Sequence, residues 1–274
     1  MSLIINADDL GYSSHRDAGI FECFEKKCLT SASLIVNGPT SESAARKAVE
    51  MGLFLGLHLN LTEGIPLTDV PLLTGDDGEM YYKDNFMALD APNTCPKLVV
   101  QETRAQLEQF KVLTGYSAKH VDGHQHVHIY PGMAELLAPV FQEYGVLSTR
   151  IPDEDLSKFE WVGGVRRKKY EMLFSTMVRA RLTYKKYGVR APECFVGLAL
   201  GGLSLGQERL DSCMKETFGT IELMVHPGHS GVLSDGCFCD SFDTSDGRMH
   251  ECEQLQTLTI RPTLCDWSVY ERVC

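Results

Sequence analysis

Short apolar runs, rich in β-branched residues, alternate along this chain with longer segments whose apolar positions recur at helical spacing. The apolar runs predict strands at residues 3–8, 31–37, 54–61, 119–123, 146–151, 194–200 and 220–226. The segments between and after them predict helices at about residues 15–27, 40–52, 97–114, 132–144, 164–187, 207–217 and 250–261. Because each strand is followed by a helix, we expect parallel strands joined by right-handed crossover connections.

This alternation also predicts the fold class. It indicates an α/β protein with about seven parallel strands, and the 274 residues are close to the ~250 typical of a (β/α) barrel. We expect a barrel or near-barrel, with an open doubly wound sheet as the alternative. Two long irregular stretches, 63–96 and 227–249, interrupt the pattern without ending it. We therefore expect one domain over residues 1–274, in which these stretches wall a binding site.

Composition and charge narrow the class of protein. There is no apolar run of the length, about 18 residues, that a membrane span needs, and no basic segment precedes the first apolar run. We therefore expect no membrane association, no signal peptide and a cytoplasmic protein, and we leave a homodimer open. The net charge of −11 disfavours nucleic acid as a partner. We interpret the basic segment 166–190 as the exposed face of a helix.

The ten cysteines are scattered without a C-x-x-C pair. In a chain of this length without a signal peptide, free thiols are expected more often than disulfides. Cys237, Cys239 and Cys252 are candidates for a metal clip, but we favour free thiols of a loop and of the core.

Polar side chains gather where the predicted strands end. They are Asp8, Asp9, His58, Asp122, His124, Arg150 and His226. In a (β/α) barrel the carboxyl ends of the strands share one mouth, where catalytic loops meet. Residues far apart in the sequence are thus expected to lie together.

This set of residues predicts a metal site. One carboxylate and two imidazoles from separate strands suit Zn²⁺ and similar ions, which activate water and polarise a carbonyl. Asp8 and Asp9 are adjacent carboxylates beside an apolar strand, and a cation would offset their repulsion. A helix-capping aspartate is the alternative for either residue, and the pattern alone does not separate their roles.

The fourth predicted strand carries the densest signal. His120, Asp122, His124, His126 and His128 alternate along it, and at ~3.3 Å per residue they cannot all reach one ion. We expect the strand to end near residue 123, which leaves His124 at the rim and the last two histidines in a loop.

Other chemistries are less well supported. The chain has no G-x-S-x-G elbow, no P-loop and no G-x-G-x-x-G fingerprint, so a metal-activated water is the expected nucleophile. A metal-dependent phosphoester hydrolase is an alternative, although Arg150 is the single basic residue at a predicted strand end. A carbohydrate-binding protein without turnover is another.

Six segments together resemble the YdjC-like carbohydrate deacetylases, and especially the animal members of that family. They are NADDLGY (6–12), TSASLIVNGP (30–39), GLHLNLTEG (56–64), HVDGHQHVHIYPG (120–132), TRIP (149–152) and ELMVHPG (222–228). The resemblance runs from near residue 3 to about residue 265. It implies a distorted (β/α) barrel related to the polysaccharide deacetylases. The implied activity is removal of N-acetyl groups from small acetylated sugars such as chitooligosaccharides.

The resemblance also implies site residues. Its motif positions make Asp9, His58 and His124 the ligands of one divalent metal ion, Zn²⁺ or Mg²⁺, with Co²⁺ or Ni²⁺ as further options. Asp8 matches the general base and His226 the candidate general acid.

Further roles complete this hypothesis. Arg150 matches a family arginine that steers Asp8 and is grouped with the catalytic residues. Asp122 or His126 is expected to orient a ligand imidazole. Candidate aromatic residues for stacking on the sugar are Tyr81, Tyr82 and Tyr130. Leu10 replaces the aromatic residue usual in the family motif, and residues 197–206 differ from the bacterial members.

Overall fold

The computed structural model describes residues 1–229 and 245–271. The strands in this part of the chain are all parallel. They are β1 (Ser2–Leu10), β2 (Ser31–Leu34), β3 (Phe54–Leu59), β4 (His120–Gly123), β5 (Ser148–Thr149), β6 (Cys194–Val196), β7 (Thr220–Val225) and β8 (Thr263–Leu264).

The strand order shows a barrel that is open on one side. Seven strands follow the order β5-β4-β3-β2-β1-β7-β6, and β8 pairs with β1. From β1 to β5 and from β6 to β7, strands that follow one another in the sequence are paired. β7 also pairs with β1, and the barrel is open between β5 and β6. A doubly wound sheet would reverse its strand order near the centre, so that alternative is wrong. The expected distorted (β/α) barrel is confirmed as a curled half-barrel.

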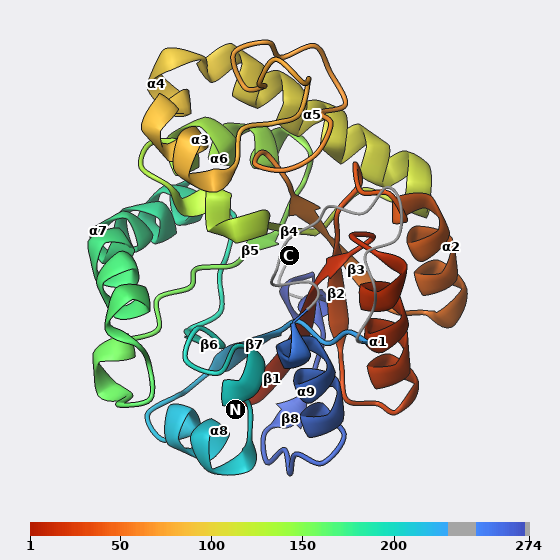
Figure 1. The fold of residues 1–274 in the computed structure, drawn as a ribbon, viewed down its shortest axis with the longest axis vertical. Coiled ribbons are helices and arrows are strands. Elements are labelled where there is room, and N and C mark those ends of the chain that lie inside the picture. Colours follow the sequence, from red (N-terminus) through yellow and green to blue (C-terminus); the bar gives the residue numbers. More distant parts are fainter. Residues whose placement is uncertain (230–244, 272–274) are drawn as a thin grey trace.

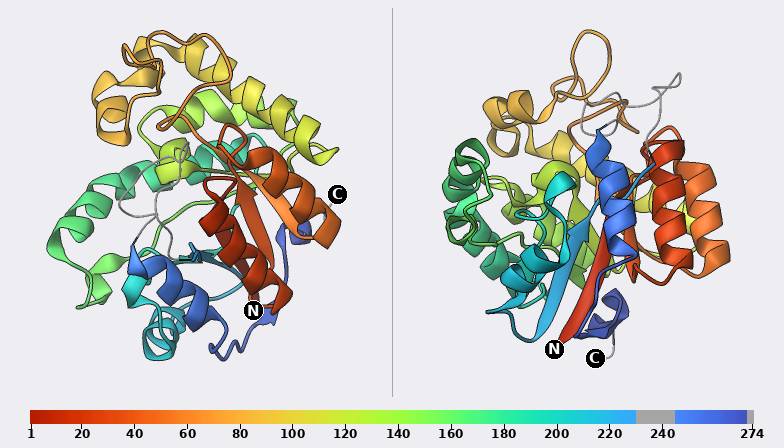
Figure 2. Two further views of the ribbon diagram at one scale, coloured as in Figure 1. Left: turned by 45° about the vertical axis from the view of Figure 1, so that its right-hand side comes forward. Right: turned by 60° about the horizontal axis from the view of Figure 1, so that its bottom comes forward.

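The helices surround the strands (Figure 1). They are α1 (Ser14–Glu25), α2 (Ser41–Met51), α3 (Lys83–Leu89), α4 (Ala91–Thr94), α5 (Pro96–Thr114), α6 (Met133–Glu143), α7 (Gly164–Lys186), α8 (Gln207–Met214) and α9 (Asp246–Leu255). Figure 2 shows α1 and α9 side by side outside the barrel. Because helices cover the outer faces of the strands and side chains fill the interior, β1 is buried from Leu3 to Leu10.

The amino-terminal end of the barrel is closed by an aromatic side chain. After β8 pairs with the start of β1, Trp267 stacks on His120, with ring centroids 3.5 Å apart. The Trp267 indole N–H donates to Asn6 Oδ1 (3.1 Å), so the polar atom of this buried ring is satisfied. His120 therefore belongs to the base of the barrel, at the opposite end from His124.

Several sequence predictions differ from the structure. The stretch 63–96 contains α3 and α4, and the last predicted helix begins and ends earlier, as α9. The predicted strand 194–200 stops at Val196, because the glycine that follows has a φ of 147°. β8 was not predicted, since two residues give no periodicity. Most of the predicted irregular stretch 227–249 lies outside the described residues.

Two expectations about composition can be compared with the structure. α7 carries most of the basic segment, and most of the arginine and lysine side chains described in it are exposed. The seven cysteines that can be described are free thiols, while Cys237 and Cys239 lie outside the described residues. Within the described chain, no helix is both long enough and apolar enough to cross a membrane.

Candidate active site

A bulge at the end of β1 brings two neighbouring carboxylates to one side. In a regular strand Asp8 and Asp9 would point to opposite faces. Asp9 instead has a left-handed backbone (φ 65°), and the register between β1 and β2 shifts between Ala7 and Leu10. Both carboxylates consequently line the same cavity. The chain therefore begins to turn at Asp9, two residues before Gly11, which also has a left-handed backbone (φ 89°).

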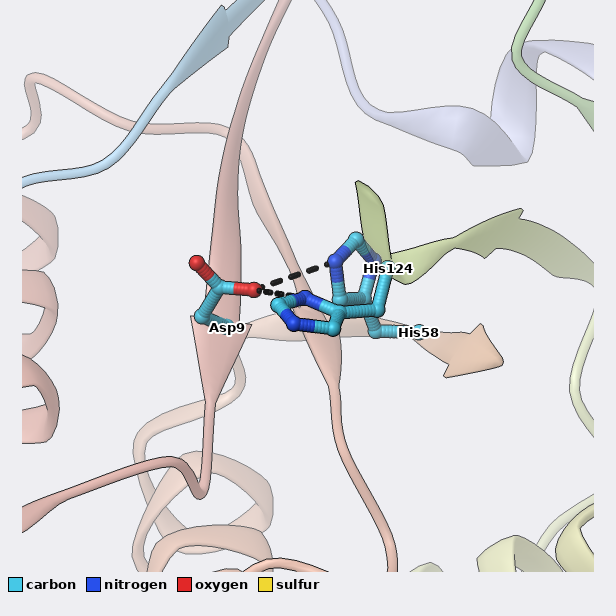
Figure 3. Close-up of side chains that lie close together, drawn as sticks. All are labelled: Asp9, His58 and His124. Carbon is cyan, nitrogen blue, oxygen red and sulfur yellow. Dashed lines mark hydrogen bonds and ion pairs between the residues drawn. The ribbon is translucent and has the colours of Figure 1, made fainter. Parts of the chain in front are cut away.

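Asp9, His58 and His124 converge on one point (Figure 3). Asp9 Oδ1 lies 3.1 Å from His58 Nε2 and 2.9 Å from His124 Nδ1. These side chains come from β1, β3 and the 3₁₀ turn η1 (His124–Ile129) that follows β4. Their ligand atoms lie within 4.8 Å of one another, and an oxygen with two imidazole nitrogens is a donor set that suits a divalent transition metal.

The two imidazoles are oriented by carboxylates behind them. His58 Nδ1 lies 2.7 Å from Asp122 Oδ1, which directs Nε2 toward Asp9. Burial lowers the pKa of His58, but Asp122 and Asp8 outweigh it and raise the pKa to about 10. His124 Nε2 lies 3.0 Å from Glu63 Oε2, which leaves Nδ1 facing Asp9. The negative charge collected around both rings is what a bound cation would neutralise.

Sequence reasoning missed two residues of this cluster. Glu63 lies in the motif GLHLNLTEG (56–64), four residues after β3, but no sequence pattern connects it with His124. Arg16, in the first turn of α1, places Nη1 2.7 Å from Asp9 Oδ2. Burial raises the pKa of Asp9, but His124, His58 and Arg16 outweigh it and hold the pKa well below its usual range. Asp9 therefore remains ionised, with Oδ1 directed to the imidazoles.

Arg150 joins three buried carboxylates. It contacts both Asp8 oxygens (2.5 and 2.6 Å), Asp122 Oδ2 (2.9 Å) and Glu222 Oε1 (2.7 Å). The Arg150 side chain is fully buried, so the three carboxylates take the place of water as partners of its guanidinium. Asp8, His58 and Asp122 also bring ligand atoms within 4.8 Å, but Arg150 holds both of those carboxylates. The set around Asp9 is thus better suited to an ion.

His226 faces Asp8 from the end of β7. Its Nε2 lies 3.7 Å from Asp8 Oδ2, and its backbone N–H donates to Glu251 Oε2 (2.5 Å). Burial, with Arg248 nearby, holds the pKa of His226 well below its usual value. The imidazole is therefore neutral at pH 7.

Comparison with known proteins supplies the family. The family model described as YdjC-like protein matches residues 2–265. This chain belongs to the YdjC-like family. Two animal relatives are named carbohydrate deacetylase: one from Mus musculus, 36% identical over 96% of this chain and 90% of its own length, and one from Homo sapiens, 35% identical over 96% and 87%. The family resemblance seen in the sequence is confirmed.

More distant proteins share part of the sequence or the fold. A Serratia marcescens protein named chitooligosaccharide deacetylase is 32% identical over 58% of this chain and 62% of its own length. A crystal structure from Enterococcus faecalis, of a protein whose suggested role is cellobiose-phosphate cleavage, matches 95% of this chain and 97% of that chain. Its TM-score is 0.64 at 20% identity, which shows a shared fold.

The cavity of this YdjC-like chain is lined by five of the six residues expected at the catalytic centre; Arg150 is not among its lining residues. The cavity has a volume of about 510 Å³ and is lined by Asp8, Asp9, His58, His124 and His226. Ligand cavities usually measure roughly 300–1,000 Å³. Of the aromatic residues considered for the sugar, Tyr130 lines the cavity, whereas Tyr81 and Tyr82 are not among its described lining residues. Tyr170, from α7, lines it and was not predicted.

The remaining residues of the 120–128 segment separate in space. Two successive left-handed residues, Gln125 and His126, turn the chain sharply within η1. His126 lines the cavity, while His128 Nε2 lies 2.8 Å from the Arg150 carbonyl oxygen, outside it. Of the two residues considered for orienting an imidazole, Asp122 contacts His58, whereas the described residues show no hydrogen bond between His126 and either imidazole.

Proposed function

We propose that this YdjC-like chain is a metal-dependent hydrolase that removes N-acetyl groups from small acetylated sugars such as chitooligosaccharides. The observation that carries the proposal is one cavity in which Asp9, His58 and His124 converge beside Asp8 and His226. The animal relatives named carbohydrate deacetylase and the bacterial chitooligosaccharide deacetylase support the substrate class.

Asp9, His58 and His124 would hold one divalent ion. The two imidazole donors favour Zn²⁺, Co²⁺ or Ni²⁺ over Mg²⁺, which prefers oxygen ligands. The chemistry supplied by such an ion is a lowered pKa for water and a polarised acetyl carbonyl. Asp122 and Glu63 keep the imidazoles aimed at this position through their contacts with the distal ring nitrogens.

Asp8 is the general base of the proposal. Its Oδ2 faces the cavity, 4.0 Å from His58 Nε2 and 3.7 Å from His226 Nε2. From there it accepts the proton of a water molecule that attacks the acetyl carbon. Arg150 acts as a positioning residue, because its two contacts fix the plane of the Asp8 carboxylate without reaching the cavity.

His226 is the general acid. When the C–N bond breaks, the leaving nitrogen takes a proton, and the products are acetate and the free amine. Because burial lowers its pKa, His226 is neutral before the reaction; the proton that Asp8 takes from the water passes to His226, 3.7 Å away, and from His226 to the leaving nitrogen. Its position beside Asp8 keeps the proton acceptor and the proton donor on the same side of the cavity.

The cavity walls suit a sugar. Tyr130 and Tyr170 offer rings for stacking, and Lys83, Gln125 and Arg166 offer polar groups for hydroxyls. α7 contributes several lining residues, and Lys83, at the start of α3, comes from the long stretch 63–96.

Acetate release from N-acetylglucosamine oligomers tests the proposal. We expect release by metal-loaded protein, its loss after chelation, and recovery on adding Zn²⁺ or Co²⁺. A phosphoester panel run in parallel tests the main alternative. Phosphate release without acetate release would replace the proposal with a phosphoesterase, and tight sugar binding without any product would replace it with a binding protein.

A further inference from the structure

A second cluster of metal-ligating side chains lies between α1 and α9. Cys23 Sγ is 3.6 Å from Cys252 Sγ, and Glu22 Oε2 is 2.7 Å from His229 Nε2. Ligand atoms of Glu22, His229 and Cys252 lie within 4.8 Å of one another. None of these four side chains is among the lining residues of the catalytic cavity.

The sulfur separation is informative about chemistry. Two thiolates on one tetrahedral Zn²⁺, at Zn–S distances of about 2.3 Å, would be about 3.8 Å apart. A disulfide needs about 2.0 Å. The observed 3.6 Å is a hydrogen-bond contact between two thiols; it is too long for a disulfide and close to the spacing that two thiolates on one ion would have. One imidazole, one carboxylate and the Cys252 sulfur lie within 4.8 Å of one another, and Cys23 Sγ, in contact with Cys252, would supply the fourth ligand of a tetrahedral site.

The surroundings of the cluster also suit a cation. Glu22 Oε1 accepts from Lys26 Nζ (2.7 Å) and Gln256 Nε2 (3.0 Å), which leaves Oε2 directed at His229. Both sulfurs are buried, whereas the side chains of His229 and Glu22 are 36% and 33% exposed and provide a route of entry. Two thiolates and the Glu22 carboxylate carry three negative charges, and Lys26 carries one positive charge. A divalent ion would bring the net charge of the cluster to zero.

We propose that Glu22, Cys23, His229 and Cys252 form a second, structural zinc site. Its location gives it a role: the segment 226–229 crosses α1, where Gly19 packs against Gly228. The backbone of this segment donates from Gly228 to the Arg248 carbonyl (3.1 Å) and from His229 to the His15 carbonyl (3.0 Å). An ion on His229 would therefore fix the segment that begins with His226. This role, unlike the binding itself, rests on the proposed function.

Cobalt loading tests the site without reference to turnover. Because the catalytic ligands contain no sulfur, thiolate-to-cobalt charge-transfer absorption would report on this cluster alone. We expect that absorption, and two metal equivalents, in the wild-type protein. Cys252→Ser should lose the absorption and one equivalent. Cys95→Ser, a buried thiol elsewhere in the chain, should keep both.

Two further variants keep the test decisive. His229→Ala changes a partly exposed side chain, so it should fold even if Cys252→Ser does not, and it should weaken the absorption. His124→Ala should lose one equivalent but keep the absorption, which separates this site from the catalytic one. Cobalt-loaded protein with reduced thiols and no charge-transfer absorption would overturn the proposal. So would a Cys23–Cys252 disulfide, detected by mass spectrometry in protein purified without reductant.

Discussion

Asp9 divides its two carboxylate oxygens between a pair of imidazoles and an arginine. Oδ1 faces His58 and His124, and Oδ2 contacts Arg16. Each imidazole in turn has a carboxylate on its far nitrogen, Asp122 or Glu63. Such outer contacts fix the tautomer and the orientation of a metal-binding histidine. The affinity of the site for an ion should therefore depend on residues that do not touch the ion.

Glu63→Gln tests this dependence. The amide keeps the shape of the side chain but loses its charge, so it holds the His124 N–H less firmly. We expect metal affinity to fall by about 10- to 100-fold, the usual loss for such a contact, as measured by competition with a chelating dye. Glu79→Gln, an exposed change in the same stretch, is the control. Equal affinity in the two variants would show that Glu63 does not support the site.

At the scale of elements, the loop after β6 depends on a buried carboxylate. Glu154 Oε2 accepts from the backbone N–H groups of Gly197 (3.2 Å) and Ala199 (2.9 Å), and this loop forms part of the cavity wall. Burial raises the pKa of Glu154 from 4.5 to about 7, more than these backbone donors lower it. The loop is thus held by a group that titrates near neutral pH.

The direction of the resulting pH dependence follows from the raised pKa. The folded state holds the Glu154 proton more tightly than the unfolded state, so this contribution to stability is full below pH 4.5 and is lost as pH rises to about 7. The loss should be at most about 3.5 kcal/mol, at about 1.4 kcal/mol per pKa unit. Unfolding by urea at several pH values measures it. The difference in unfolding free energy between wild type and Glu154→Gln should change over this range, and a constant difference would contradict the assignment.

The strands and the site differ in how far the sequence predicts them. The strand positions were predicted because most of the strands are short apolar runs. Since parallel strands end on the same side of a barrel, the gathering of polar residues at one mouth was predicted as well. α3 and α4 were not predicted, because helices of seven and four residues are too short to show periodicity. The contacts of Glu63 and Arg16 depend on the path of loops. The backbone at Asp9 depends on a bulge that apolar patterning does not record.

At the scale of the whole molecule, an open barrel must close its gap and its ends. α7 connects β5 to β6 on the open side (Figure 1). Leu173 and Tyr170 from this helix line the cavity. The base is filled by Trp267, which is 1% exposed and contacts Ile4 and Tyr270. The mouth is left for the side chains that we propose to bind metal and to catalyse the reaction. Stability and chemistry therefore occupy opposite ends of the strands.

Trp267→Ala tests this separation. Removing a buried tryptophan leaves a cavity and should lower the unfolding free energy by about 3–5 kcal/mol, measured by urea denaturation. Metal affinity of the remaining folded protein should change much less, because Trp267 reaches the ligand His58 through His120 and Asp122 rather than by direct contact. Leu264→Ala, an exposed change in the neighbouring strand, serves as the control. A loss of metal affinity as large as the loss of stability would show that the two ends are coupled.

The most direct test of the central claim is the Asp8→Asn variant, with bound metal and acetate release measured on the same sample. Asparagine keeps the size of the side chain but cannot accept the proton of the attacking water. We expect wild-type metal content and acetate release reduced by at least about 100-fold, the low end of general-base contributions. Acetate release near the wild-type rate would contradict the claim that Asp8 is the base. Loss of the metal together with the activity would instead show that Asp8 helps to hold the ion.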